Sequence, residues 1–379
     1  MKIGIEGQRL FRVKKHGMDM VALELIKNLQ LIDKENEYYI FIKPDEDKSC
    51  LQETKNFHLI ELDGGAYPTW EQIALPMAAK KYGCDILHCT SNTAPLSTSI
   101  PLVVTLHDII YLESISILKK GGTWYQKMGN MYRRYVVPRV VKKSRKIITV
   151  SHFEKNRIKG FFGFPEADQR LVAVYNGVGE YFIPIVDKVE LNRVKEKYHL
   201  PNRFAFFLGN TDPKKNTKGV LKAFSDYLKS GNEPLELVML DYEKSALSSL
   251  LSEIGDNQLI NHIHLTGYVV NTDLPAIYSQ CAIFLYPSLR ESFGIPMLEA
   301  MRCGCPVITS NTSSMPEVSG DAAILIDPFK PEEITAAMIK VLTNSELRIE
   351  LIEKGKLQAA KFSWKAMAQE VLNIYNEII

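Results

Sequence analysis

Short apolar runs that alternate with helical stretches constrain the fold of this chain more than any other feature. In the first half, strand-length runs rich in β-branched and aromatic residues lie at Lys2–Glu6, Tyr38–Ile42, His58–Leu62, Asp85–Cys89, Leu102–Leu106 and Lys146–Val150. The stretches between them have helical patterns, near Gly17–Gln30, Thr69–Lys80, Thr123–Lys143 and Ser151–Gly160. Strands that alternate with helices in this way predict βα units around a parallel sheet that is buried on both faces.

A second series of the same kind follows the turn-forming residues 176–178. Before it, Tyr181–Pro201 has no clear strand period, and we interpret this segment as the crossover between two domains. The strands predicted in the second series are Phe204–Leu208, Leu235–Leu240, His262–Thr266, Ala282–Leu285, Pro306–Thr309 and Ala323–Ile326. Helices are predicted between them at Thr217–Lys229, Lys244–Ile254, Leu274–Gln280 and Pro296–Arg302, and again in the tail, Pro331–Ile379.

The two series predict two α/β domains. The length of 379 residues agrees, because an average domain has about 150 residues. We expect one Rossmann-like, doubly wound domain over residues 1–180 and a second over residues 200–362. Residues 363–379 are expected to form a C-terminal helix that packs back toward the N-terminal domain.

Charge and composition argue against several classes of protein. With 46 basic and 44 acidic side chains, the net charge of +2 gives no reason to expect a nucleic-acid partner. No window approaches 18 consecutive apolar residues, so no membrane span is expected. The six cysteines lack the paired spacings of a zinc site or a disulfide framework. Basic residues such as Arg9 and Lys14 stand where a signal peptide would be apolar, and we therefore expect a cytoplasmic protein.

Ligands of open α/β sheets bind beyond the carboxyl ends of the strands, so residues that follow strands are the first candidates. The densest group lies in residues 286–306. Pro296 suits the first turn of a helix, which places Glu291 in the preceding loop and Glu299 on the helix itself. Backbone N–H groups at such a helix N-terminus favour a phosphate. The alternative interpretation is that Glu299 faces solvent, as single glutamates on short helices commonly do.

Two further groups follow strands in the same way. Gly209 would allow a close approach to the backbone, and Lys214 and Lys215 could neutralise a diphosphate. The alternative is a solvated lysine pair in a turn before an Asn-capped helix. His107 ends the strand Leu102–Leu106, where it is either a ligand contact or a structural histidine with satisfied hydrogen bonds.

Together these motifs resemble the retaining family-four glycosyltransferases of the GT-B architecture, over nearly the whole chain. Glu291 and Glu299 match the E-x7-E pair of that family, within Pro-Ser-x-x-Glu-Ser-Phe-Gly-Ile-Pro-Met-Leu-Glu-Ala-Met. Other matches, in the expected order, are His107-Asp108, Val150-Ser151-x-Phe153, Asn176-Gly177-Val178, Gly209…Pro213-Lys214-Lys215-Asn216, Pro316-Glu317-Val318 and Phe362-Ser363-Trp364. The resemblance implies two Rossmann-like domains that face each other across a cleft.

The resemblance also implies a role for each matching residue. Glu299 would hold the ribose hydroxyls of a nucleotide-sugar donor, and Lys215 would bind its diphosphate. Glu291 and His107 would contact the donor sugar, so the expected catalytic residues are His107, Glu291 and Lys215. The expected donor-binding residues are Gly209, Asn210, Lys214, Lys215, Ser292, Phe293, Gly294, Ile295 and Glu299. The expected residues of the acceptor side or the cleft are His16, Gly17 and Asp108.

Two positions depart from the pattern of the family. Asn210 stands where members often have an arginine that pairs with the lysine on the diphosphate. Lys214 or an arginine of the N-terminal domain would have to replace that charge. Gly17 is the only glycine in a first loop that has two in many members, which leaves the acceptor side less defined.

The implied reaction is transfer of a hexose with retention of configuration, without a metal or other cofactor, in the synthesis of cell-surface polysaccharide or glycoconjugates. The donor would be GDP-mannose or a UDP-hexose, and the acceptor a saccharide or lipid-linked saccharide. We favour front-face attack assisted by the leaving phosphate, with Lys215 and the helix N-terminus stabilising the leaving group. The alternative function is a catalytically silent protein of the same fold that binds sugar nucleotides.

Two other functions have weaker support in the sequence. The run Asp45-Glu46-Asp47 formally matches the DxD motif of metal-dependent glycosyltransferases, but it is interpreted more simply as a solvated loop. A dinucleotide-dependent oxidoreductase would need G-x-G-x-x-G after the first strand, and Gly4-Ile5-Glu6-Gly7 lacks that spacing.

A basic segment with interleaved aromatic residues lies in the predicted N-terminal domain. Its members are Lys119, Lys120, Trp124, Tyr125, Tyr132, Arg133, Arg134, Tyr135, Arg139, Lys142, Lys143, Arg145 and Lys146. On a helix, such residues suit peripheral contact with an anionic membrane at its inner face, or with a lipid-diphosphate acceptor. The alternative is a solvated helix face whose aromatic residues pack inward.

Overall fold

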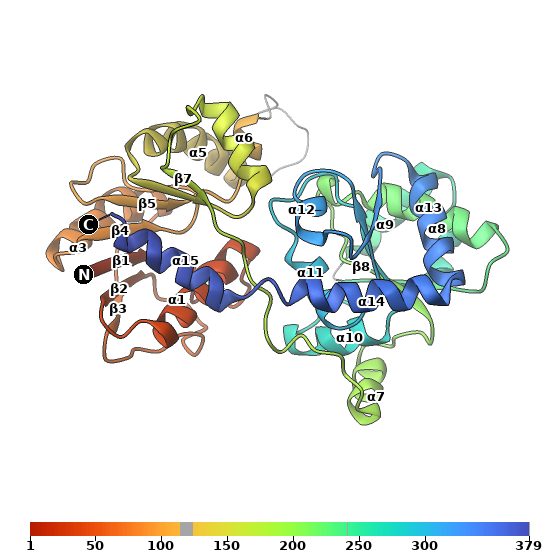
Figure 1. Cartoon of the computed structure of the whole chain (residues 1–379). Coiled ribbons are helices and arrows are strands. Elements are labelled where there is room, and N and C mark those ends of the chain that lie inside the picture. Colours follow the sequence, from red (N-terminus) through yellow and green to blue (C-terminus); the bar gives the residue numbers. More distant parts are fainter. Residues whose placement is uncertain (114–123, 241, 379) are drawn as a thin grey trace. The chain divides into compact units, whose positions relative to one another are not determined.

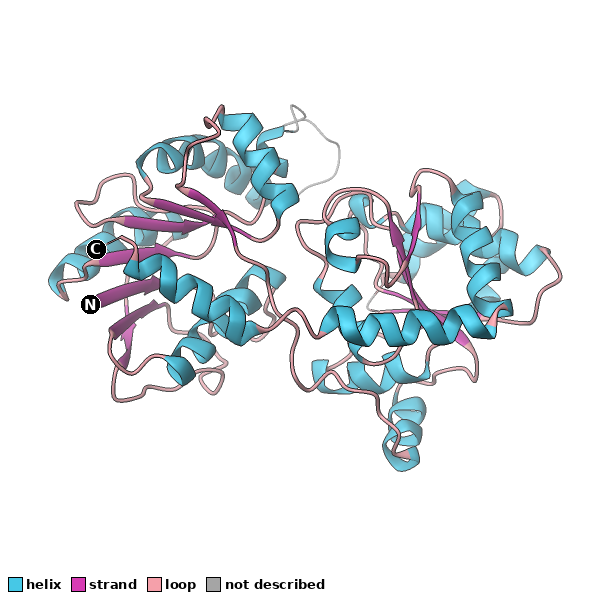
Figure 2. Ribbon diagram, viewed as in Figure 1, coloured by secondary structure: helices cyan, strands magenta, loops and turns pink. Residues whose placement is uncertain are grey.

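The computed structural model describes residues 1–113, 124–240 and 242–378, and the chain divides into two compact units (Figure 1). Unit 1 consists of Met1–Gly177 and Trp364–Ile379, and unit 2 of Val178–Ser363. In each unit, helices surround a parallel sheet (Figure 2). The predicted α/β fold of two Rossmann-like sheets is thus confirmed. Lys119 and Lys120 of the basic segment lie outside the described residues.

Within the described residues, the sheet of unit 1 has seven parallel strands in the order β3-β2-β1-β4-β5-β6-β7. Their bounds are β1 (Lys2–Glu6), β2 (Glu37–Ile42), β3 (Phe57–Glu61), β4 (Ile86–Cys89), β5 (Leu102–Thr105), β6 (Lys146–Thr149) and β7 (Leu171–Ala173). Ile3 of β1 lies in register with Tyr38 on one side and Ile86 on the other. The strand order reverses between β1 and β4, and open α/β sheets bind their ligands at such a switch point.

Helices cover both faces of this sheet. They are α1 (Gly17–Ile32), α2 (Tyr67–Thr69), a single π-helical turn η1 (Trp70–Ala74), α3 (Leu75–Lys81), α4 (Ile110–Glu113), α5 (Trp124–Lys143), α6 (His152–Phe162) and α15 (Trp364–Asn376). Leu87 and Cys89 of β4 pack in one cluster with Val136 of α5. His88 lies between them in the sequence, and its Nδ1 is 2.6 Å from the hydroxyl of Tyr375 on α15, a helix that packs against α1.

In the described part of unit 2, six parallel strands have the order β10-β9-β8-β11-β12-β13. They are β8 (Phe204–Phe207), β9 (Glu236–Met239), β10 (Ile263–Leu265), β11 (Ile283–Tyr286), β12 (Val307–Ser310) and β13 (Ile324–Ile326). This is the same order as in the first six strands of unit 1, so a second switch point lies between β8 and β11.

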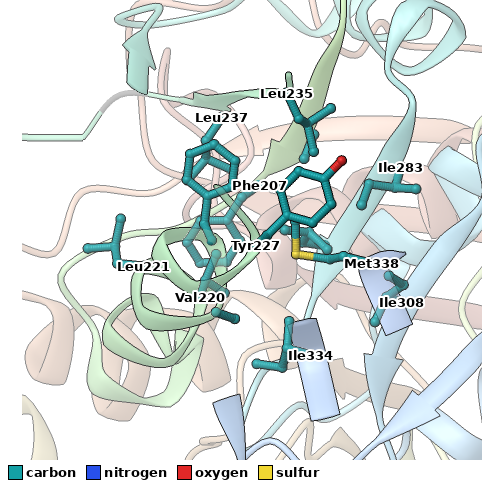
Figure 3. Packing of buried hydrophobic residues seen from close by; sticks show 14 of the residues in the cluster. Phe207, Val220, Leu221, Tyr227, Leu235, Leu237, Ile283, Ile308, Ile334 and Met338 are labelled. Atoms are coloured by element: carbon teal, nitrogen blue, oxygen red, sulfur yellow. The ribbon is translucent and has the colours of Figure 1, made fainter. Parts of the chain in front are cut away.

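The helices of unit 2 pack apolar faces against this sheet. They are α7 (Lys188–Lys197), the 3₁₀ turn η2 (Pro213–Lys215), α8 (Thr217–Lys229), α9 (Lys244–Ile254), the 3₁₀ turns η3 (Asn257–His262) and η4 (Asn271–Asp273), α10 (Leu274–Gln280), α11 (Ile295–Arg302), α12 (Met315–Ser319), α13 (Pro331–Thr343) and α14 (Ser345–Ala359). On one face, Phe207 and Ile283 from the strands pack with Val220 of α8 and Met338 of α13 (Figure 3).

Helix α7 and strand β7 were not expected from the sequence, and neither were the short helices α4 and α12. Helix α7 lies inside the segment interpreted as an irregular crossover. It is polar over most of its surface, with Val194 as its buried residue, so few apolar residues mark it as a helix. Its position is held by Arg193 and Lys197, which both pair with the buried Asp273. Strand β7 has three residues, too few for alternation to reveal it. Within the described ranges, every helix is too short or too polar to cross a membrane.

Candidate active site

Two loops of unit 2 meet at its switch point and carry most of the predicted donor-binding residues. The first follows β8 and contains residues 208–216; the second follows β11 and contains residues 287–294. The backbone N–H of Leu289 donates to the carbonyl oxygen of Lys214 at 2.7 Å, so the loops lie side by side. Both are at the carboxyl edge of the sheet, where ligands of doubly wound folds bind.

Lys215 and Glu291 form an ion pair between these loops. The distance from Lys215 Nζ to Glu291 Oε1 is 2.6 Å, and the two side chains are only 17% and 12% exposed. Lys215 Nζ also lies 3.3 Å from the Tyr286 hydroxyl. Two predicted catalytic residues are therefore brought together, a cation that can face a diphosphate and a carboxylate that can accept hydrogen bonds from sugar hydroxyls.

Glu299 lies on α11 and does not simply face solvent. Its Oε2 accepts a hydrogen bond from the Tyr278 hydroxyl at 3.1 Å. Burial raises the pKa of Glu299 to about 7, against a smaller lowering by the Tyr278 hydrogen bond. The alternative interpretation of an ordinary solvated glutamate is therefore wrong, and the carboxyl group titrates near neutral pH.

The N-terminus of α11 has a fixed shape. Gly294 precedes the first helical residue, Ile295, with φ of +102°, and a Cβ atom there would lie 2.8 Å from Met297 Cε. Phe293 is buried and packs edge-on against Phe362 at 5.6 Å between ring centroids. The loop therefore reaches the helix through a conformation that favours glycine. Ser292 lies in the same loop, and the backbone N–H groups of residues 292–294 come directly before the first residue of α11.

The β8 loop is shaped by its own side chains. A Cβ atom on Gly209 would lie 2.2 Å from the Phe207 ring, so a larger residue does not fit without rearrangement. Asn210 accepts the Asp212 N–H at 2.9 Å and so supports the turn. Lys214 lies 3.7 Å from Asp212 and is partly exposed, which leaves its ammonium accessible.

Asn216 has a structural role that sequence reasoning missed. It adopts the left-handed conformation with φ of +60° and precedes α8, but its side chain does not cap the helix. Instead its amide group donates to the carbonyl oxygens of Pro287 at 3.1 Å and Pro328 at 2.7 Å. Asn216 therefore ties the lysine turn to the β11 loop. The sequence feature that could have indicated this role is the position of Asn216 directly after Lys214 and Lys215.

The predicted residues of unit 1 lie at or near the carboxyl edge of its sheet. His107 follows β5, is 5% exposed, and its Nε2 lies 3.0 Å from the Thr90 carbonyl oxygen. Asp108 accepts the Ile110 N–H at 3.1 Å at the start of α4. His16 caps α1, and its own N–H donates to Asp19 at 3.0 Å. Gly17 begins α1, where a Cβ atom would meet nothing within 4 Å, so space alone does not require glycine there.

The DxD-like run gains no support as a metal site. Asp47 forms an ion pair with Lys15. Asp45 lines a small cavity of about 200 Å³ together with Phe11 and Glu61. Over the parts of the chain that the structure describes, no group of three or more His, Cys, Asp or Glu residues is arranged to hold a metal ion.

Comparison with known proteins matches each unit to a family. The family model "Glycosyltransferase Family 4" matches residues 17–179, and "Glycosyl transferases group 1" matches residues 188–358. O-antigen chain mannosyltransferase B of Escherichia coli is 35% identical over 60% of this chain and 60% of its own length. Serotype-specific mannosyltransferase WbdA of Escherichia coli is 31% identical over 56% of this chain and 26% of its own length. The chain thus spans less than two thirds of both relatives.

Solved structures agree at the level of the fold. Sucrose-phosphate synthase from Thermosynechococcus elongatus has a TM-score of 0.74 at 14% identity and covers 100% of this chain, with 98% of its own chain matched. HepE of Anabaena, in complex with UDP and glucose, has a TM-score of 0.74 at 17% identity, with 100% of both chains covered. The two family models together take in most of both units, and the chain belongs to the family-four glycosyltransferases of the GT-B architecture.

Proposed function

We propose that this protein is a retaining mannosyltransferase that uses a nucleoside-diphosphate mannose, with GDP-mannose as the first candidate donor. The main observation in favour of a transferase site is the ion pair between Lys215 Nζ and Glu291 Oε1, which lie 2.6 Å apart at the switch point of unit 2. Glu299 lies on the adjoining helix. Mannose is favoured over a UDP-hexose because the two Escherichia coli relatives described above are named mannosyltransferases. Their names also favour a saccharide acceptor in cell-surface polysaccharide synthesis.

In the proposed reaction, the bond between the sugar C1 and the phosphate oxygen breaks, and the acceptor oxygen bonds to C1 on the same face. The acceptor hydroxyl proton passes to the departing phosphate oxygen, and the nucleoside diphosphate leaves. Lys215 would exchange its partner Glu291 for the diphosphate, where its charge stabilises the leaving group. Glu291, released from Lys215, would accept hydrogen bonds from the sugar. Glu299 would accept hydrogen bonds from the hydroxyl groups of the ribose.

In unit 1, His107 remains the proposed catalytic residue, and the exposed face of α5 would contact an anionic membrane that carries the acceptor. On this face Met128, Met131 and Tyr135 are 47%, 64% and 56% exposed, at helical spacing. Arg139 stacks on the Tyr135 ring at 3.8 Å, and Lys142 follows one turn later. Apolar side chains flanked by cations suit the interface of anionic lipids. Tyr132, by contrast, points inward and donates to Glu71.

The test is transfer from a panel of GDP-mannose, GDP-glucose, UDP-glucose and UDP-galactose to a mannosylated acceptor. GDP-mannose should support transfer, and Lys215→Ala and Glu291→Ala should each lower kcat/KM by about 100-fold or more, the range of a lost electrostatic contact to a leaving group. Lys218→Ala is the matched control, because Lys218 pairs with Glu253 on the surface. Near wild-type transfer by both variants at saturating donor would refute the assignment. Binding of GDP-mannose with neither transfer nor slow hydrolysis would favour the catalytically silent protein.

A further inference from the structure

A run of hydroxyl side chains at the end of β12 holds the loop that follows β11. Residues 309–314 have the sequence Thr-Ser-Asn-Thr-Ser-Ser, and five of these six side chains form hydrogen bonds with the backbone of residues 286–293. The run begins where the two parallel strands end: Thr309 lies in register with Tyr286 and donates to its carbonyl oxygen at 2.9 Å. Side-chain hydroxyls thus continue the pairing of β11 and β12 beyond their last paired backbone residues.

The last two serines of the run bind the backbone around Glu291. The N–H of Glu291 donates to Ser313 Oγ at 3.0 Å. The hydroxyl of Ser314 donates to the Glu291 carbonyl oxygen at 3.0 Å and to the Phe293 carbonyl oxygen at 3.1 Å. Because a serine hydroxyl has one hydrogen, the two carbonyl groups share it. Ser314 is 0% exposed, so this shared hydrogen bond lies in the interior of unit 2.

Neither serine is explained by the local structure of its own segment. Ser314 is the N-cap residue of α12, where a serine side chain commonly accepts a backbone N–H of the helix. In the described chain, however, the Ser314 side chain makes no cap hydrogen bond to α12. Ser313 adopts the left-handed conformation with φ of +51°, which costs conformational energy for a residue with a Cβ atom. The contacts of both side chains instead serve the loop that contains Glu291.

The two carbonyl groups that Ser314 binds set the direction of the N–H groups next to them. No peptide bond in the described ranges is cis, and in a trans peptide the N–H points opposite to the preceding C=O. The Glu291 and Phe293 carbonyls point toward Ser314, so the N–H groups of Ser292 and Gly294 point away from it. Both lie directly before the first residue of α11. N–H groups with a common direction before a helix suit an anion.

We propose that Ser314 is a positioning residue of the donor site, which holds the peptide units 291–292 and 293–294 so that their N–H groups face the second phosphate of a nucleoside diphosphate. This inference rests on the proposed function for the nature of the ligand. It predicts that Ser314 strengthens the binding of the second phosphate and has little effect on the binding of a nucleoside monophosphate.

The first test needs no ligand. Hydrogen exchange of the full-length protein, followed by mass spectrometry, measures the protection of the amides of residues 288–294. Ser314→Ala leaves two carbonyl groups without their donor, so exchange in this loop should become about tenfold faster or more. Ser319→Ala is the matched control, because it removes another 0% exposed hydroxyl from the far end of α12, one that has no hydrogen-bond partner among the described residues. Its loop should exchange at the wild-type rate.

Loop exchange in Ser314→Ala that is as slow as in the wild type would overturn the inference. If Ser314→Ala does not fold, Ser314→Cys decides by the same measurement, because the thiol has a similar size but is a weak donor. Ser314→Thr keeps the hydroxyl and should retain the slow exchange of the wild type.

The second test compares nucleoside diphosphates with monophosphates. GDP, GMP, UDP and UMP are titrated calorimetrically into the wild type, Ser314→Ala and Ser319→Ala. For the base that binds, Ser314→Ala should weaken the affinity for the diphosphate about tenfold and that for the monophosphate less than about twofold. Ser319→Ala should change neither affinity. An equal loss for both nucleotides would mean that the site has loosened as a whole, and the inference would be wrong.

These outcomes separate the inference from the proposed function. If GDP-mannose supports transfer but the ratio of the GDP and GMP affinities is the same in Ser314→Ala and in the wild type, the inference fails and the proposed function stands. If the wild type binds neither GDP nor UDP, the proposed function fails, and the role of Ser314 toward a phosphate fails with it.

Discussion

At the scale of single residues, the proposed role of Glu299 predicts that nucleotide binding depends on pH near neutrality. Its carboxyl group has a pKa of about 7 and accepts the hydroxyl of Tyr278. If Glu299 binds the ribose as a carboxylate, protonation below pH 7 replaces an acceptor with a donor. Affinity for the nucleoside diphosphate should therefore fall as the pH drops from 8 to 6.

Calorimetric titration of GDP across this pH range measures the effect. The Tyr278→Phe variant should lose affinity at a higher pH than the wild type, because the hydrogen bond from Tyr278 lowers the pKa of Glu299. Glu299→Gln should bind weakly at every pH. If the pH at which half of the GDP affinity is lost is the same in Tyr278→Phe and in the wild type, a group other than Glu299 titrates.

The sequence singled out the individual residues of the candidate donor site but not their pairing. The spacing of Glu291 and Glu299 and the lysine turn were recognisable, because the residue types stand close together in the chain. The contact between Lys215 and Glu291 joins two separate loops, and it depends on β8 and β11 being neighbours in the sheet.

At the scale of elements, the π-helical turn η1 places Glu71 in the interior. Glu71 is 0% exposed and accepts the Tyr132 hydroxyl of α5, and burial raises its pKa to about 7. Because the folded protein binds this proton more tightly than the unfolded chain, whose pKa is near 4.5, the stabilisation is complete below pH 4.5 and is lost as the pH rises through 7. The deprotonated form therefore destabilises unit 1 under alkaline conditions.

Glu71→Gln removes this penalty and keeps an acceptor for Tyr132. The variant should be more stable than the wild type at pH 8, by on the order of 1–3 kcal/mol, and nearly equal to it at pH 4.5. Urea unfolding followed by fluorescence at the two pH values measures the difference. An equal effect at both pH values would mean that packing, not ionisation, is responsible.

Helix α5 allows a test of membrane contact. The full-length protein should sediment with vesicles of phosphatidylglycerol and not with vesicles of phosphatidylcholine, because its exposed face combines Met131 and Tyr135 with cations. Replacing both residues by glutamate should abolish sedimentation. Replacement of the exposed Met77 of α3 by glutamate is the control and should have no effect. If the wild type never sediments with anionic vesicles, the membrane proposal is wrong.

Among the elements, those with a strong apolar pattern were predictable and those without it were not. Strands such as β8 and β11 are fully apolar and bounded by turn residues, so their positions follow from the sequence. The turn η1 lies inside a segment predicted as one regular helix, and its wider turn is set by packing that buries Trp70 and Glu71. Helix α7 forms ion pairs with Asp273, and no local pattern reveals such long-range contacts.

At the scale of the whole molecule, unit 1 depends on a helix encoded far from the rest of it. Helix α15 buries Trp364, Met367, Val371 and Ile374. Each large apolar side chain contributes roughly 1.5–3 kcal/mol when buried. Deletion of residues 364–379 should therefore abolish the cooperative unfolding of unit 1 and leave unit 2 folded.

Hydrogen exchange measured by mass spectrometry can follow the two units separately. In the truncated protein, amides of β1 and β4 should lose protection while those of β8 and β11 keep it. Tyr375→Phe, which keeps the packing but removes the 2.6 Å contact with His88, should cost only about 1–3 kcal/mol. Full protection of β1 in the truncated protein would contradict the expectation.

The division of the chain also sets the order in which its two units can fold during synthesis. Unit 2 is continuous in sequence, whereas unit 1 is interrupted by it and ends with Trp364–Ile379. During translation, the unit that is begun first therefore cannot be completed until the whole of unit 2 has been synthesised. Until then the apolar face of α1 lacks its covering helix, and the nascent chain exposes a surface to which chaperones bind. All the residues that unit 2 needs are therefore made before those that complete unit 1.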